Sequence, residues 1–173
     1  NKMSMVQLHQ LSPNFKIKKI EKQKDENIKK KEGLSVMENI KQLIIVRKDL
    51  EMPVGKLAAQ VSHASLLSFL NSLDKTNEKD ERIENNQEIF ILNKDNYSYD
   101  WLHGSFAKVT LGVKNENQLL KYKKIAEEND IPFALITDEG RTCFDGEPTI
   151  TCLGVGPYEN DTLDKFFKKL RLY

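Results

Sequence analysis

The sequence predicts an α/β protein, in the form of a three-layer α/β/α domain on a four-stranded mixed β-sheet. Strand-like and helical stretches alternate along residues 41–173 in the order β-α-β-α-β-β-α, which is typical of this class. The run 41–47 has an apolar, β-branched centre, as expected of a strand that is buried on both faces. Right-handed crossovers make the first strands parallel, and the short connection before the last strand makes that strand antiparallel.

Size and composition agree with this class. A length of 173 residues is enough for one domain with a hydrophobic core. A content of 39% hydrophobic and 31% charged residues indicates a soluble, polar protein. We expect no membrane-spanning helix and no secretory signal. Cys143 and Cys152 lack the spacing of metal ligands, so we expect two free thiols in a reducing compartment.

The first helix is expected over residues 54–73, directly after the first strand. Pro53 keeps Met52 extended, and Gly55 allows a close approach of the backbone where the helix begins. Small residues fill much of this helix and allow it to pack closely on the sheet. They are Ala58, Ala59, Ser62, Ala64 and Ser65.

A polar insertion at 74–104 separates this helix from the second strand. A loop of such length is usually functional or disordered. Its aromatic residues Tyr97, Tyr99 and Trp101 allow two interpretations. They line a groove for nucleobases, or they anchor the insertion to the domain, and we favour the anchor.

The second half of the chain supplies the remaining strands and helices. Strands are expected at 106–113, 133–137 and 149–155, and Gly156-Pro157 is expected to end the last of them. Helices are expected at 115–129, where Asn115 is the cap, and at 162–170.

Residues 1–36 are predicted to be a flexible, lysine-rich extension, and residues 37–173 to be the folded domain. Residues 1–32 hold nine lysines and four acidic residues, whereas the rest of the chain has a net charge of −4. The extension is either a solvated segment, which we favour, or a basic arm that contacts phosphate. The acidic domain would need a local patch to bind nucleic acid.

Chemistry is expected at the carboxyl ends of the parallel strands, where ligands gather in such sheets. Lys56, Gln60 and His63 follow the first strand and fall within one narrow stripe of the helix, at about 100° per residue. A lysine at a helix start opposes the helix dipole, so Lys56 is either a surface residue or a group that binds phosphate or an ester. His63, taken alone, is more often a packing residue than a catalytic one.

The third strand ends in a second polar segment, which includes Asp138, Arg141 and Thr142. Asp138 is either a cap for the Gly140 turn or a general base or orienting group. Arg141 either forms a structural ion pair or binds phosphate. The sequence contains no phosphate-binding loop, dinucleotide motif, zinc spacing or nucleophile elbow. These residues therefore predict a polar site without naming its substrate.

Read together, several segments resemble the type II peptidyl-tRNA hydrolase family. They occur in one order and cover residues 41–173 apart from the insertion; they are Gln42–Leu50, Gly55–Ala64, Lys108–Leu111, Asp138–Thr142, Pro148–Thr151, Gly154–Pro157 and Leu170–Tyr173. The resemblance implies the same α/β/α fold. It also implies hydrolysis of the ester between a peptide and the terminal ribose of tRNA, in the cytoplasm or in an organelle with its own translation.

The resemblance further implies roles for individual residues. The partner is tRNA, no cofactor or metal is expected, and a homodimer is left open. The implied catalytic residues are Lys56, His63, Asp138, Thr142 and Thr151. The implied substrate-binding residues are Gln60, Lys108, Gly140, Arg141 and Thr149.

Ester hydrolysis needs an activated water and a partner for the oxyanion. Lys56 and backbone amides near Gly140 are expected to take the oxyanion charge. Asp138, with His63, is expected to orient or deprotonate the water, and the identity of the base is open. Many family members carry a second lysine where this chain has Val54. The alternative function is therefore a catalytically silent module that binds tRNA or a protein on the same fold.

Overall fold

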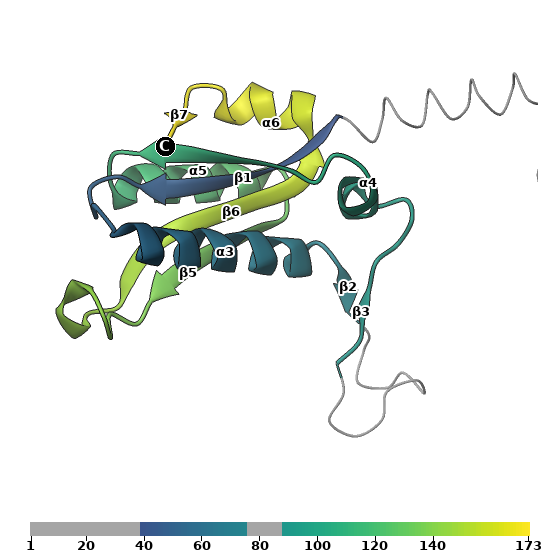
Figure 1. Cartoon of the computed structure of the whole chain (residues 1–173). Helices are drawn as coiled ribbons and strands as arrows, with labels where there is room; N and C mark the ends of the chain where they lie inside the picture. The colour runs from purple at the N-terminus through teal and green to yellow at the C-terminus, as the bar shows by residue number, and fades with distance from the viewer. Residues whose placement is uncertain (1–38, 76–87) are drawn as a thin grey trace, which may run out of the picture. The chain divides into compact units, whose positions relative to one another are not determined.

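The structure is a computed structural model that describes residues 39–75 and 88–173. The predicted extension and residues 76–87 of the insertion lie outside the described residues. The elements are β1 (Ile40–Arg47), α3 (Val54–Asn71), β2 (Asp74–Lys75), β3 (Phe90–Ile91), α4 (Tyr97–His103), β4 (Ala107–Val113), α5 (Glu116–Glu128), β5 (Phe133–Asp138), the short 3-10 helix η1 (Phe144–Gly146), β6 (Thr149–Glu159), α6 (Asn160–Phe167) and β7 (Arg171–Leu172) (Figure 1).

A mixed sheet with the strand order β5-β6-β1-β4-β7 forms the centre of the domain (Figure 1). β1 and β4 are parallel, with Ile44 opposite Thr110. β6 is antiparallel to both β1 and β5, so β5 runs in the same direction as β1. The predicted α/β class, the mixed sheet and the antiparallel last main strand are confirmed.

The predicted number of four strands is wrong, because the sheet has five strands in the described residues. The additional strand, β7, pairs its two residues with Leu111 and Gly112 of β4. A strand this short shows no alternating pattern in the sequence.

The predicted end of the last main strand is also wrong. β6 continues through Gly156-Pro157 to Glu159, and its register against β1 shifts between Lys41 and Leu43. Gly156 has a φ of +84°, which lets the chain bulge and then resume pairing. As a result α6 begins at Asn160, earlier than predicted, and ends at Phe167.

Helices pack against the sheet through two separate buried clusters. Ile44 and Val46 of β1 belong to one cluster, together with Ala64 of α3. Leu43 and Ile45 belong to the other, which includes residues of α5 and α6. Successive side chains of a strand point to opposite faces, so β1 is buried on both, as predicted.

The helix α3 lies unusually close to β6. A Cβ atom added to Gly154 of β6 would lie 2.2 Å from the carbonyl oxygen of Ala64, so only glycine fits there. Ser65 donates to Oε1 of Gln42 at 2.6 Å, and Ser68 donates to the carbonyl oxygen of Gly156. The small residues of α3 therefore allow the close packing that the sequence predicted.

Aromatic residues anchor the described part of the insertion. Trp101 of α4 is buried and donates from Nε1 to the carbonyl oxygen of Ala107 at 2.8 Å. Its ring packs against Phe106, with 4.4 Å between centroids. Tyr97 packs against Tyr158 of β6 with 4.8 Å between centroids. The anchoring interpretation is confirmed for Trp101 and Tyr97.

Cys143 and Cys152 are both free, as predicted. None of the helices in the described ranges is long and apolar enough to cross a membrane.

Candidate active site

The centre of the site is an ion pair between the start of α3 and the end of β5. Nζ of Lys56 donates to Oδ2 of Asp138, across 82 residues of sequence. Both side chains are largely buried, at 14% and 13% exposed. β1 and β5 run in the same direction, so both end at one edge of the sheet. The two polar segments of the sequence therefore meet there.

A chain of hydrogen bonds from three further groups holds this pair in place. Nε2 of Gln60 donates to Oδ2 of Asp138 at 2.9 Å, and the amide of Gly140 donates to Oδ1 at 2.9 Å. The hydroxyl of Thr151, on β6, donates to Oε1 of Gln60 at 2.5 Å. Gln60 and Thr151 are buried at 3% and 0% exposed. The buried side chains of Gln60 and Thr151 thus fix the position of the carboxylate through hydrogen bonds.

These donors hold the pKa of Asp138 below its ordinary value. The hydrogen bond from Lys56 is the largest cause, the Gly140 amide and Gln60 add to it, and burial opposes it. The carboxylate is therefore charged at neutral pH and gives Lys56 a constant partner.

The loop after β5 is shaped by Gly140. This residue has a φ of +78°, and a Cβ atom on it would lie 2.6 Å from the backbone nitrogen and oxygen of Glu147. The amide of Gly146 donates back to the carbonyl oxygen of Gly140 at 3.2 Å. The tight loop places the hydroxyl of Thr142 at 3.4 Å from Nζ of Lys56.

An open pocket of about 260 Å³ lies over the ion pair. His63 is exposed and lines its wall, about one helical turn beyond Gln60. The lining residues are Lys56, Gln60, His63, Ile136, Thr137, Asp138, Glu139 and Arg141.

The family profile described as peptidyl-tRNA hydrolase PTH2 matches residues 40–173. The chain belongs to this family. The resemblance seen in the sequence is confirmed, and the matched range begins at the first residue of β1.

Individual relatives cover the same part of the chain. The peptidyl-tRNA hydrolase of Saccharolobus solfataricus is 33% identical over 134 residues, which are 77% of this chain and 98% of that protein. The peptidyl-tRNA hydrolase of Methanopyrus kandleri is 36% identical over 126 residues, 72% of this chain and 90% of that protein. The one from Haloquadratum walsbyi is 33% identical over 135 residues, 78% of this chain and 100% of that protein.

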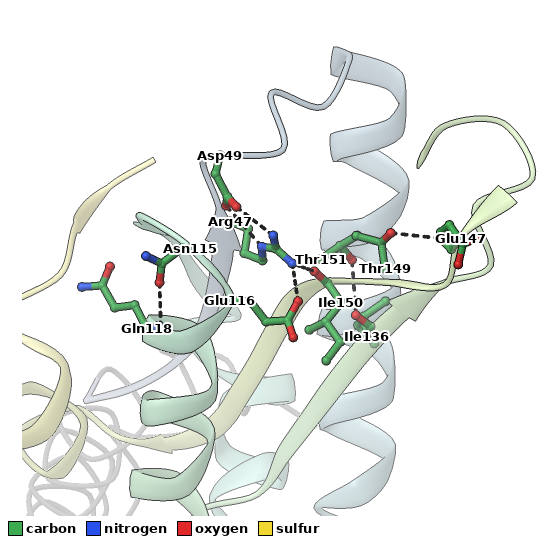
Figure 2. Close-up of polar contacts among 10 residues, drawn as sticks. All are labelled: Arg47, Asp49, Asn115, Glu116, Gln118, Ile136, Glu147, Thr149, Ile150 and Thr151. Carbon is green, nitrogen blue, oxygen red and sulfur yellow. Dashed lines mark hydrogen bonds and ion pairs between the residues drawn. The ribbon is translucent and has the colours of Figure 1, made fainter. Parts of the chain in front are cut away.

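Two residues of this PTH2-family chain that were predicted to bind substrate lie beside the hydrogen-bond chain. Arg141 lines the pocket and pairs with Glu139 at 2.7 Å, and both side chains are exposed. The hydroxyl of Thr149 donates to the carbonyl oxygen of Glu147 at 2.9 Å (Figure 2).

Lys108 is not brought to the pocket. It lies near the start of β4, in register with Gln42 near the start of β1, whereas the site follows the end of β1. Its ammonium lies 3.2 Å from the ring centre of Phe106. Burial lowers the pKa of Lys108. Lys108 is not among the residues that line the pocket, and its role in binding substrate stays a prediction.

Arg47, which was not predicted from the sequence, organises the edge of the sheet beneath the site. Its guanidinium, 11% exposed, donates to both carboxylate oxygens of Asp49 at 3.2 and 2.7 Å and to Glu116 at 2.7 Å. It also donates to the carbonyl oxygen of Ile150 at 2.9 Å, directly before Thr151 (Figure 2). The signal in the sequence was a cation that ends a buried strand, two residues before a carboxylate.

Proposed function

We propose that this chain is a peptidyl-tRNA hydrolase, which cleaves the ester between a peptide and the terminal ribose of tRNA. Its membership of the family, and the name that its relatives share, support this activity. The observation that carries the proposal is the ion pair of Lys56 with Asp138 beneath an open pocket. Ester hydrolysis needs fixed positive charge where negative charge develops.

Lys56 is the proposed partner of the oxyanion. An ammonium group has three N–H donors, of which Asp138 and Thr142 account for two. We assign the third to the carbonyl oxygen of the ester, which becomes negative as water adds. The amide of Gly140 is bonded to Asp138, so we do not assign it to the oxyanion.

Asp138 is proposed to position Lys56 rather than to act as the base. Its carboxylate accepts three hydrogen bonds and its pKa is lowered, and both effects weaken it as a proton acceptor.

We assign the base to His63, which lines the same pocket, because a neutral imidazole has one ring nitrogen that accepts a proton. The water oxygen bonds to the carbonyl carbon and its proton passes to His63. Cleavage of the carbon–oxygen bond then releases the ribose oxygen, which takes up that proton.

Arg141 is proposed to contact phosphate near the end of the tRNA. Its guanidinium matches the geometry of a phosphate group. The present pair with Glu139 is between side chains that are 83% and 72% exposed, so it contributes little and is readily exchanged.

A release assay with N-acetylated aminoacyl-tRNA tests the activity. Turnover by the wild-type protein that is lost in Asp138→Asn supports the hydrolase. Tight binding of tRNA without any turnover would instead support the silent binding module. In the part of the chain that the structure describes, no observation favours that module.

Other expectations stay proposals. The α/β/α layering is supported by the two buried clusters that share alternate residues of β1. A homodimer, a location in the cytoplasm and a phosphate-binding role for residues 1–36 are further proposals. The first can be tested by the mass of the protein in solution.

A further inference from the structure

The face of α3 that carries the candidate site changes character along the helix. Lys56, Gln60 and His63 recur at helical spacing, and Leu67 and Leu70 continue the same stripe. Leu67 is 41% exposed, and its neighbour Leu66 is 60% exposed. A polar half of the stripe therefore leads directly into an apolar half that lies open at the surface.

These leucines form one wall of a groove of about 430 Å³, and β5 forms the other. The lining residues are His63, Leu66, Leu67, Leu70, Leu135, Ile136 and Thr137. Three of them, His63, Ile136 and Thr137, also line the pocket over the ion pair. The groove is therefore continuous with the candidate active site, and His63 stands at the junction.

We propose that this groove binds the peptide part of peptidyl-tRNA, extended and with a preference for apolar side chains; this inference rests on the proposed function. The substrate joins a polyanion and a peptide at the ester. Among the described residues that line the groove there is no lysine or arginine. Phosphates would lose their hydration there without gaining a partner, whereas apolar side chains gain by burial.

The tRNA part of the substrate then extends from the pocket on the side opposite the groove. Arg141 lines the pocket over the ion pair but does not line the groove. Charge therefore orients the substrate, with phosphate toward Arg141 and peptide toward Leu67.

The edge position of β5 suits a peptide of any sequence. In the described ranges β5 pairs with β6 alone and ends the strand order of the sheet. An edge strand presents unpaired backbone N–H and C=O groups, which an extended peptide can bind through its own backbone. The backbone thus supplies general binding, and the leucines supply the apolar preference.

The length of the groove sets the number of peptide residues. Lys56 lies at Asp138, whereas Nδ2 of Asn71 donates to the carbonyl oxygen of Phe133 at 2.9 Å, so α3 and β5 run in opposite directions. Helix α3 rises about 1.5 Å per residue, so the leucine wall from His63 to Leu70 is roughly 10 Å long. An extended chain covers that length with about three residues.

A series of substrates tests this length with the wild-type protein. We would measure kcat/KM for one tRNA that carries N-acetylated chains of one, two, three or five leucines. We expect kcat/KM to rise about tenfold up to three residues and then to stay constant. A constant kcat/KM across the series, or a rise that continues to five residues, would contradict the proposal that the groove binds the peptide. Failure to hydrolyse even the single-residue substrate would instead contradict the proposed function.

A matched pair of variants tests the position of the groove. Leu67 and Leu102 are helical leucines that are 41% and 39% exposed, and only Leu67 lines the groove. The readout is the ratio of kcat/KM for the three-leucine substrate to that for the one-leucine substrate, which does not depend on the fraction of folded enzyme. We expect Leu67→Gln to lower this ratio to about one, and Leu102→Gln to keep the wild-type ratio. Equal ratios in both variants would overturn the assignment.

Discussion

Lys56 and Asp138 form an ion pair that joins the start of α3 to the end of β5, with both side chains largely withdrawn from water. A second pair, Lys41 with Asp164, has a carboxylate that is 61% exposed. Both pairs join a lysine to an aspartate. Because charges interact more strongly where water is excluded, the pair of Lys56 with Asp138 is the stronger one. The difference makes the second pair a useful control for the first.

Replacing Asp138 by Asn should lower kcat about 100-fold, because Lys56 loses the charge that holds it toward the pocket. Asp164→Asn should leave kcat within about twofold of wild type. Both are measured by release of peptide from N-acetylated aminoacyl-tRNA, with thermal unfolding to confirm the fold. A fully active Asp138→Asn protein would remove Asp138 from the mechanism.

The pH dependence of the rate should separate the two candidate bases. Since the pKa of Asp138 is lowered, its carboxylate is charged at all pH values above the ordinary one of about 3.9. Its contribution to stability is complete above that value and is lost only as the pH falls through the lowered pKa. If Asp138 were the base, kcat/KM would fall only over that acidic range, so a fall at higher pH would show that the base is another group.

Replacing His63 by Gln should lower kcat/KM about 100-fold, because the proposed base is lost. The measurement is kcat/KM of both proteins at neutral pH, with thermal unfolding to confirm the fold. If His63→Gln keeps the wild-type kcat/KM, the base is not His63.

Gly154→Ala should destabilise the fold by about 1–3 kcal/mol, because the new methyl group meets the backbone of α3 at Ala64. The close backbone approach expected at Gly55 is not seen, since a Cβ atom there meets nothing within 4 Å. Gly55→Ala is therefore the matched control, because alanine also favours a helix. Calorimetry on both variants gives the change in free energy of unfolding. Equal stability of the two would show that α3 can move away from β6 at little cost.

Arg47→Lys should cost about 1–3 kcal/mol of unfolding free energy, although the charge is kept. A lysine cannot reach Asp49, Glu116 and the carbonyl oxygen of Ile150 together, as the guanidinium does. Arg171→Lys, at an exposed position of β7, is the control. Urea unfolding compares them, and a stable Arg47→Lys protein would show that one ion pair is enough at this edge.

Local periodicity and chain topology made much of the site predictable. The spacing of Lys56, Gln60 and His63 follows from the helix alone, and the position of Asp138 follows from strands that run in one direction. Periodicity could not predict how deeply each of these side chains is buried. Gln60 is buried beneath the carboxylate while His63, three residues on, is exposed, because the stripe crosses from the sheet to the open surface.

Other features depended on contacts that a sequence pattern does not carry. β7 is too short to show periodicity, and the extension of β6 depends on a bulge at Gly156. Lys108 matches a family motif, and its separation from the pocket follows from its position near the start of β4. The partners of Arg47 come from three elements that are far apart in sequence.

The position of β6 has a consequence for how the protein is made. β6 is the last long strand to leave the ribosome, yet it lies between β1 and β5 in the sheet. A nascent chain that ends before Thr149 already contains Lys56 and Asp138 but lacks the strand that sets them side by side. The ion pair therefore forms only when synthesis is nearly complete, as expected where distant segments must pair. An unfinished copy of this protein, still attached to its own tRNA, would contain Lys56 and Asp138 but not the strand that brings them together.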